Sequence, residues 1–526
     1  MEIRTEVVIC GAGPAGLTLA HLLGAEGVEV TVLEKLDNTV QEPRAIAIDG
    51  ESLRTLQRTG LLAGFEDELL SGLTADYVNG EGELLFQAGQ PERRPYGFST
   101  VNSFDQPALD RYLAESLVQR ESVSLCFGHT LEGFEQDEQG VRVRCTDAGG
   151  NSKEILARYL VGCDGGRSTI RAQLGIAMSG ESNPQPWLVI DTVDPHLDNE
   201  MDCRFFCDPR RPGMTIRKQH GERRWEWMLM PGEKREFLLE DSTIRELIAP
   251  YTDVERVDIY RKRVYDFHAI MAERWRDGRV FLAGDAAHMT PPFAGQGLNS
   301  GFRDVANLSW KLAAAVQGRA APSILDSYEP ERRDHAWELI GTALELGRQI
   351  QPIDAQQAAE RDTFFAAVNQ DPAAVEAFQD EMFKSILERS IDQGLVVDAG
   401  TAGAGRLLIQ PELATPEGGR APLDQYLGGG FALLGFNCNI QAELGEQGLA
   451  AWSALGAKHV NIASVDSDGA GACLLDLGGE FADWLGTTEP MILLVRPDRF
   501  CMVSASPADA AAQLQAARLL LAGGAD

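Results

Sequence analysis

The first 35 residues pass from an apolar run through a glycine-rich turn into a helical pattern. Residues 7–9 (VVI) form a β-branched apolar run, and leucines recur over residues 17–23 at helical spacing. A second apolar run, residues 28–33, ends at Glu34. The pattern predicts a strand, a tight turn, a helix and a second strand, which together make a βαβ unit.

Three glycines at G-x-G-x-x-G spacing occupy the predicted turn. Gly11 suits the tight turn, Gly13 lets the backbone approach a pyrophosphate, and Gly16 lets the helix pack on the strand. The helix N-terminus then faces the phosphates, and Glu34 stands where a carboxylate binds a ribose hydroxyl. This spacing alone arises by chance, but the flanking strands, the helix and the terminal acid all agree with it. We therefore predict a dinucleotide site, which also includes Pro14, Ala15 and Lys35.

The pattern changes along the next 350 residues. Helical spacing returns near Ser52 and over residues 105–119, and residues 74–88 predict a hairpin. Long strands dominate from Trp187 to about His268, which predicts a separate sheet inserted into the nucleotide domain. We predict an α/β fold with a Rossmann-like nucleotide-binding domain (residues 1–72, 105–178 and 276–397), an inserted antiparallel sheet domain (residues 73–104 and 179–275) and a C-terminal domain (residues 398–526).

The C-terminal domain follows a glycine-rich stretch, residues 398–405. Its predicted elements are strand 431–436, helix 441–457, strand 459–465, short helix 481–485, strands 491–495 and 500–504, and helix 509–522. A βαβ unit followed by ββα is typical of a thioredoxin-like domain. The chain has no CxxC and hence no dithiol to cycle, so we expect a packing or oligomerising role, which leaves a homodimer open.

Composition narrows the classes of partner. The formal charge is −32, from 79 acidic and 47 basic residues, and it argues against a nucleic-acid or anionic-membrane surface. The nine cysteines show no paired framework, and Cys203 and Cys207 have no histidine cluster beside them, so we expect reduced thiols, a cytoplasmic protein and no metal site. No run approaches the roughly 18 apolar residues of a membrane span.

Two further motifs follow predicted buried strands. In LVGCDGGRSTIR the strand leads to Asp164 and Gly165. In FLAGDAAHMTPPFAGQGLNSGF it leads to Gly284 and Asp285, and a proline-glycine loop then leads into a helix at Gly297. Apolar residues step by three and four along this helix and predict one buried face: Leu298, Phe302, Val305, Leu308 and Leu312.

With these three motifs in order over residues 5 to about 395, the sequence resembles the flavoprotein aromatic hydroxylases, the class A FAD monooxygenases of the p-hydroxybenzoate hydroxylase type. The third domain and the stretches PRAIAIDGE, QPALDRYL, RWEWMLMPGE and VRPDRF are similar to the phenol hydroxylase and 3-(3-hydroxyphenyl)propionate hydroxylase branch. The resemblance implies that NADH or NADPH reduces FAD, and that the reduced flavin captures dioxygen as a 4a-hydroperoxide and hydroxylates a phenolic ring. A second Rossmann fingerprint is absent, so we expect the nicotinamide nucleotide to bind transiently on the FAD domain.

The resemblance also implies roles for individual residues. Gly11, Gly13, Gly16 and Glu34 would hold the ADP half of FAD, Asp285 the ribityl chain, Arg44 and Gln106 the diphosphate and ribityl region, and Asp164 with Gly165 both FAD and the nicotinamide nucleotide. The backbone N–H groups of Gly297, Leu298 and Asn299, at a helix start, form an anion site that can stabilise the negative charge of a reduced flavin. Pro292 and its neighbour Pro291 fix the loop beside the ring, where water must be kept out.

The substrate is less defined by the sequence. Arg217, Trp227 and Met228 lie on predicted strands of the inserted sheet, and we name them as candidates for the substrate pocket, although alternation alone does not tell which side faces inward. Two alternatives stay open: a tailoring hydroxylase that acts on a polyketide or antibiotic, and a flavin-binding module without catalysis.

Overall fold

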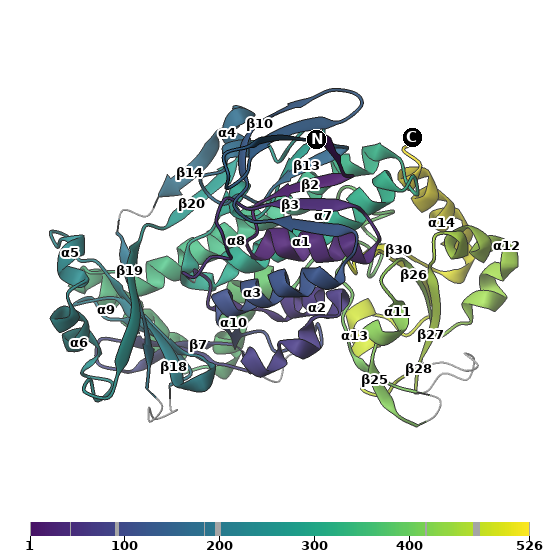
Figure 1. The fold of residues 1–526 in the computed structure, drawn as a ribbon. Helices are drawn as coiled ribbons and strands as arrows, with labels where there is room; N and C mark the ends of the chain where they lie inside the picture. The colour runs from purple at the N-terminus through teal and green to yellow at the C-terminus, as the bar shows by residue number, and fades with distance from the viewer. Residues whose placement is uncertain are drawn as a thin grey trace.

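The computed structural model describes residues 2–42, 44–89, 94–182, 185–194, 201–415, 418–465 and 474–524. Figure 1 shows three regions side by side: a central region with α1, α7 and α8, the inserted sheet with β18 and β19 on one side, and the C-terminal region with β26 to β30 on the other. Among the described residues, no helix is long and apolar enough to cross a membrane.

The central region is built on a six-stranded sheet in the order β21-β22-β13-β2-β3-β9. Its strands are β2 (Val7–Cys10), β3 (Val30–Leu33), β9 (Val123–Cys126), β13 (Tyr159–Gly162), β21 (Arg276–Asp277) and β22 (Val280–Leu282). All neighbours are parallel except the short edge strand β21. Helix α1 (Pro14–Ala25) connects β2 to β3, which confirms the predicted βαβ unit. Both faces of β2 are buried, as its unbroken apolar run requires.

Helices cover one face of this sheet and a second sheet covers the other (Figure 1). The helices are α1, α2 (Gly50–Thr59), α3 (Gln106–Ser116), α7 (Gln296–Val316) and α8 (Tyr328–Ile350). The second sheet has the order β1-β12-β11-β10, with β1 (Glu2–Arg4), β10 (Thr130–Gln136), β11 (Val141–Thr146) and β12 (Ser152–Ala157). The predicted stripe on α7 is core: Phe302, Val305, Leu308 and Leu312 are fully buried, and Leu298 is half-buried.

The inserted sheet has seven strands in the order β19-β15-β18-β17-β16-β6-β7. They are β6 (Ala75–Asn79), β7 (Leu84–Ala88), β15 (Trp187–Val193), β16 (Cys203–Cys207), β17 (Gly213–Arg217), β18 (Glu222–Met228) and β19 (Asp258–Tyr265). The sheet is not wholly antiparallel as predicted, because β16 pairs with β6 in parallel. The predicted hairpin β6–β7 comes from an earlier part of the chain than β16. No hairpin turn connects β6 to β16, so the two strands are free to pair in parallel.

Smaller elements join these regions. Two three-stranded sheets have the orders β14-β20-β23 and β4-β8-β5. Their strands are β4 (Ala47–Ile48), β5 (Leu70–Ser71), β8 (Asn102–Ser103), β14 (Met178–Ser182), β20 (His268–Ala272) and β23 (His288–Met289). The remaining helices before the C-terminal region are α4 (Thr169–Gln173), α5 (Arg235–Leu238), α6 (Asp241–Ile248), α9 (Ala355–Val368) and α10 (Pro372–Leu387).

The C-terminal region forms a sheet in the order β25-β24-β28-β27-β26-β29-β30. Its elements are β24 (Glu412–Ala414), β25 (Arg420–Pro422), α11 (Asp424–Leu427), β26 (Ala432–Phe436), α12 (Ile440–Ala454), β27 (Lys458–Ser464), β28 (Leu474–Asp476), α13 (Glu480–Leu485), β29 (Met491–Val495), β30 (Cys501–Ala505) and α14 (Pro507–Leu521). Strand β26 is parallel to β27 and antiparallel to β29. Every element predicted here is present within three residues, whereas the short strands β24, β25 and β28 were not predicted.

Candidate active site

The three glycines of the first turn have different surroundings. Gly11 has φ +105°, and a Cβ there would lie 2.3 Å from the carbonyl oxygen of Cys163. A Cβ on Gly16 would lie 2.0 Å from the carbonyl oxygen of Gly11. A Cβ on Gly13, in contrast, would meet nothing within 4 Å. The fold itself therefore requires Gly11 and Gly16, and the open space over Gly13 is what the approach of a pyrophosphate requires.

The start of α1 is open to an anion. Gly13 precedes the helix and no side chain caps it, while Pro14 occupies the first turn. Glu34, at the end of β3, accepts hydrogen bonds from the backbone N–H of Ala12 (2.8 Å) and of Leu36 (2.9 Å), which holds its carboxylate beside the turn. The uncapped N–H groups at Ala15 and Gly16 and the adjacent carboxylate form the kind of cradle that binds a nucleotide.

Three distant segments meet at Arg44, where Gln106 holds the backbone and Asp285 lies near the side chain. Gln106 Oε1 accepts hydrogen bonds from the backbone N–H of Arg44 (3.0 Å) and of Ala45 (2.7 Å). The Arg44 guanidinium extends from this loop, is two-thirds exposed, and has its Nη1 3.7 Å from Asp285 Oδ2. The resemblance implies that Arg44, Gln106 and Asp285 contact the ribityl and diphosphate region of FAD, and in the structure Arg44 lies beside both of the others. The adjoining Lys35 is exposed near the end of β3.

The second and third motifs lie at the ends of neighbouring strands. Asp164, after β13, accepts from the backbone N–H of Thr169 through Oδ2 (2.7 Å), while its buried Oδ1 has no partner. Gly165 has φ +81° and open space where a Cβ would lie. Gly284, after β22, has φ +60° and donates its N–H to Asp304 Oδ2 (2.9 Å). These positions border the glycine turn, because a Cβ on Gly284 would lie 3.4 Å from that of Ala15.

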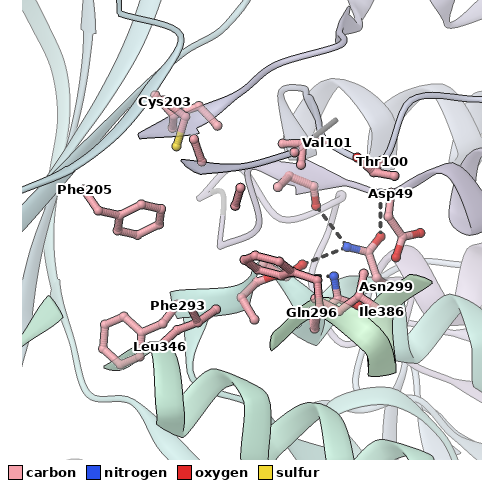
Figure 2. Close-up of a pocket in the computed structure, with 18 of the residues that line it drawn as sticks. Asp49, Thr100, Val101, Cys203, Phe205, Phe293, Gln296, Asn299, Leu346 and Ile386 are labelled. Carbon is pink, nitrogen blue, oxygen red and sulfur yellow. Dashed lines mark hydrogen bonds between the residues drawn. The ribbon is translucent and has the colours of Figure 1, made fainter. Parts of the chain in front are cut away.

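The N-terminus of α7 has no side-chain cap either. Gly295, with φ +64°, precedes the helix and has no side chain to cap it, so the N–H groups of the first turn, including Gly297 and Leu298, have no capping side chain. The Asn299 side chain is fully engaged: its Oδ1 accepts from the Asp49 N–H (3.1 Å) and the Ser52 hydroxyl (2.7 Å), and its Nδ2 donates to the Gly295 carbonyl (2.7 Å). Its contribution beyond the backbone is therefore to hold the loop before α2 against the α7 N-terminus (Figure 2).

A cavity of about 130 Å³ opens beside this helix start. Figure 2 shows Asn299 and Asp49 at one end and the rings of Phe205 and Phe293 at the other. The wall is mostly apolar and comes from the inserted sheet, the loop before α7 and helix α10: Tyr77, Phe205, Met214, Ile216, Pro292, Phe293 and Phe383. The described residues that line it include no lysine, arginine or histidine.

The three substrate candidates from the sequence do not line this cavity. Trp227 is on the opposite face of the sheet, where it stacks on Phe206 with ring centroids 5.4 Å apart. Arg217 pairs with Asp202, Nε to Oδ1 at 2.6 Å. Met228 packs in the same apolar cluster as Phe293 but does not line the cavity. The structure thus places these three side chains outside the cavity lining, and the sequence did not show this because a strand that is buried on both faces hides which parity points inward.

The sequence analysis named Pro292 and Asn299, which line the cavity, but missed most of the other residues that form its wall. Phe205 belongs to the stretch CRFFC, whose strand-like alternation is a signal that could have identified it. Phe383 lies on α10, a helix that carries no recognisable motif. Glu226 lies on the same face of β18 as Met228, since the two are two residues apart, and it does not line the cavity. Burial raises the pKa of Glu226 to about 7, although Arg224, 3.9 Å away, opposes this shift.

His288 is not placed for proton transfer. Its Nε2 lies 2.7 Å from Asp304 Oδ2, and both side chains are buried. Burial alone raises the pKa of the Asp304 carboxyl, but the neighbouring His288 and Arg332 hold it below its ordinary value. The pair thus joins β23 to α7 beneath the third motif, as a structural histidine would.

The site fits a flavin dinucleotide. The glycine turn offers an uncapped helix N-terminus and free space over Gly13. The buried Asp164 Oδ1 has no partner, and a second uncapped helix N-terminus borders the cavity. Residues 4–343 match the family model described as the FAD binding domain. The chain belongs to the FAD-dependent monooxygenase family. It is an oxidoreductase that uses FAD, and NADH or NADPH is the reductant typical of this family.

Relatives agree with this assignment along the whole chain. Residues 405–519 match the family described as the HcaD C-terminal domain. A 3-(3-hydroxy-phenyl)propionate/3-hydroxycinnamic acid hydroxylase of Burkholderia cenocepacia is 38% identical over 94% of this chain and 93% of its own. A second hydroxylase of that name, from Burkholderia vietnamiensis, is 39% identical over 94% of this chain and 93% of its own. The crystal structure of aklavinone-11 hydroxylase with FAD and aklavinone shares the fold, with a TM-score of 0.80 and 24% identity over 98% of this chain and 99% of its own.

Proposed function

We propose that this protein hydroxylates a single-ring phenol with an uncharged side chain, with dioxygen as the oxygen source and NADH or NADPH as the electron donor. The observation that carries the proposal is the apolar cavity beside the α7 N-terminus. Its volume of about 130 Å³ is similar to that of cavities of about 150 Å³ that accept benzene. A ring system of three or four fused rings needs more space than this.

The residues divide the work by position. Gly11, Gly13, Gly16 and Glu34 would hold the ADP half of FAD, Asp285 with Arg44 and Gln106 its ribityl and diphosphate part, and Asp164 with Gly165 the junction with the nicotinamide nucleotide. Bound FAD supplies dioxygen activation and transfer of one oxygen atom to the ring.

The α7 N-terminus would act on charge in this site. The N–H groups of Gly297 and Leu298 would stabilise negative charge on the flavin ring, because a helix start concentrates unpaired donors. Pro292 and Phe293 would exclude water from the reacting ring. The substrate ring would pack between Phe293 and the inward face of β16 and β17.

The substituent that we propose for the substrate ring is uncharged, unlike those of the substrates named for the relatives. Their names give substrates that carry a carboxylate. The described wall residues include no lysine, arginine or histidine, so a buried carboxylate would have no cationic partner there and would depend on neutral donors such as Tyr77 and Gln87. An uncharged substituent avoids this desolvation cost.

The test is stopped-flow reduction of the bound FAD by NADH and by NADPH, with three additives compared: 3-propylphenol, 3-(3-hydroxyphenyl)propionate and a hydroxylated anthraquinone. We expect 3-propylphenol to accelerate reduction most and to yield a product one oxygen atom heavier. Faster reduction with the propionate would overturn the proposal that the ring substituent is uncharged, but it would still agree with a phenolic substrate. Acceleration by the anthraquinone alone would favour a tailoring hydroxylase, and no response to any additive would favour a module without catalysis.

We also propose that the C-terminal region is a thioredoxin-like domain without redox function, since β26, α12 and β27 precede the antiparallel pair β29–β30 and α14. The chain has no CxxC in this region. A homodimer and a cytoplasmic location remain part of the proposal. The location is supported by the eight cysteines of the described chain, which are all free thiols.

A further inference from the structure

A second, smaller cavity lies where α2, α7 and α8 meet the C-terminal region. Its volume is about 20 Å³, and Phe500 and Leu407 close it from the C-terminal side. Six of the residues that line it are arginines: Arg54, Arg58, Arg303, Arg332, Arg389 and Arg499. This cavity is separate from the active-site cavity and shares none of its wall residues.

Several of these guanidinium groups have unused donors. The buried atoms Arg332 Nη2, Arg389 Nη1 and Arg499 Nη1 have no hydrogen-bond partner, and neither does Arg58 Nε. The residues Arg332, Arg389 and Arg499 are only 2%, 4% and 2% exposed, so water outside the protein does not reach these donors. A buried donor without a partner destabilises the fold, and more so when it is charged.

The carboxylates nearby do not balance the arginines. Glu51 pairs with Arg303 (2.6 Å) and Arg389 (3.1 Å). Asp424 pairs with both Arg54 and Arg499. Asp304 forms an ion pair with Arg332, and Asp49 forms one with Arg303.

Two residues of the lining show the imbalance most clearly. Asp498 is paired with Arg496, which does not line the cavity. Arg58 has no ion pair among the described residues. Burial, together with the neighbouring Arg499 and Arg54, lowers the pKa of Arg58 to about 10 against the opposing effect of Asp498 and Asp424, and the group stays charged at neutral pH. The cluster therefore carries an excess of buried positive charge.

We propose that this cavity binds one small inorganic anion of chloride size. An anion would accept charge-assisted hydrogen bonds from the unused arginine donors and offset the excess charge. The space of about 20 Å³ is enough for one water-sized species and excludes a large organic anion.

The anion would reinforce the junction between the two regions. Arg499 comes from the C-terminal region, whereas Arg58 and Arg332 come from α2 and α8. Without an anion these like charges repel each other across the junction. Since the anion binds the folded protein and not the unfolded chain, it should raise the unfolding temperature by mass action.

The test uses the FAD-loaded protein at constant ionic strength, with sodium chloride, sodium bromide or sodium gluconate as the salt. We expect the unfolding temperature to be higher in 100 mM chloride or bromide than in gluconate by at least about 1 °C. Crystals soaked in bromide should show an anomalous peak inside the arginine cluster. Equal unfolding temperatures in all three salts, or density for water alone without a bromide peak, would overturn the proposal.

The variant Arg58→Gln removes the cation without a carboxylate partner. We expect the unfolding temperature of this variant to be independent of halide. In gluconate it should be no lower than that of the unsubstituted protein. Arg256→Gln is the matched control, since Arg256 is 63% exposed and pairs only with Asp253 nearby in the chain. It should keep the full halide dependence. If Arg58→Gln does not fold, the bromide peak in the unsubstituted protein decides the question.

Discussion

Arg496 Nη2 of the C-terminal region donates to Glu331 Oε2 of α8 at 2.7 Å, and neither side chain is exposed. Glu331 also accepts from Lys311 Nζ of α7 at 2.7 Å. Burial alone raises the pKa of Glu331, but the two cations hold it well below its usual range. The helix whose N-terminus borders the active-site cavity is thus fixed to the C-terminal sheet by buried charges.

Arg496→Met should lower the free energy of unfolding by about 3–5 kcal/mol, because it leaves Asp498 and part of Glu331 buried without their cation. Chemical denaturation of the FAD-loaded protein measures the change. Arg518→Met is the matched control, since Arg518 is exposed on α14 and its loss should change stability by under about 0.5 kcal/mol. Equal stability of both variants would mean that the buried pair is not a structural tie.

Truncation before residue 398 should damage the protein although all three FAD motifs remain. It would expose Trp310, which packs on Phe431 with ring centroids 5.6 Å apart, together with Lys311 and Glu331. We expect aggregation or loss of FAD, measured by gel filtration and flavin absorbance.

Cys438→Ser tests whether this damage is structural or redox in origin. The Cys438 thiol is buried and donates to the Met491 carbonyl, and Cys473 of the same region lies outside the described residues. Normal turnover of Cys438→Ser would agree with a packing role, and loss of turnover in a folded protein would contradict it.

A buried carboxyl near the predicted diphosphate site should make stability fall as pH rises. Burial raises the pKa of Asp110 to about 8, opposed by a hydrogen bond from Gln106. Because the unfolded chain releases this proton near pH 4 and the folded chain near pH 8, the Asp110 contribution is present at low pH and is lost between these values. Asp110→Asn should therefore unfold at a higher temperature than the unsubstituted protein at pH 8, with the difference shrinking toward pH 5.

Thermal unfolding across pH 5 to 8 measures this difference. Glu121→Gln removes an exposed carboxylate instead and should leave the pH dependence unchanged. A parallel pH dependence in Asp110→Asn and the unsubstituted protein would show that Asp110 is ionised in the fold.

The sequence predicted those features of the fold that depend on residues close together in the chain. The glycine turn, α1 and the βαβ and ββα order of the C-terminal region depend on residues close in the chain, and the structure contains them. The parity of β18 and the parallel pair β16–β6 depend on contacts between distant segments. The ion pair Arg54–Asp424 joins residues 370 positions apart, so the arginine cavity has no signal in sequence spacing.

The glycine turn offers a pair of variants that separate binding from folding. Gly13→Ala should fold normally, because its Cβ meets nothing within 4 Å, but should weaken FAD binding at least about tenfold, or ~1.4 kcal/mol, by filling the space over the turn. Gly11→Ala should destabilise the fold itself, because its Cβ would lie 2.3 Å from the Cys163 carbonyl oxygen at φ +105°. FAD titration and thermal unfolding without FAD measure the two effects.

The control for both is Gly341→Ala on α8, where a Cβ also meets nothing within 4 Å. Alanine is favoured over glycine inside a helix by about 0.8–1.0 kcal/mol, so this variant should be as stable as the unsubstituted protein or more so. Unchanged FAD affinity in Gly13→Ala would contradict the proposal that the pyrophosphate of FAD binds at this turn.

Arg44 is the remaining test of the cofactor site. Its backbone is fixed by Gln106, while its guanidinium is 66% exposed and lies 3.7 Å from Asp285, so it is free to meet a phosphate. Arg44→Lys keeps the charge but removes the planar fork that can hold two phosphate oxygens. We expect reduction of FAD by the nicotinamide nucleotide to slow at least about tenfold, a barrier change of ~1.4 kcal/mol, or FAD affinity to fall by a similar factor. The exposed Arg256→Lys serves as control and should change neither quantity. If Arg44→Lys also keeps both the reduction rate and the FAD affinity, Arg44 has no part in the cofactor site.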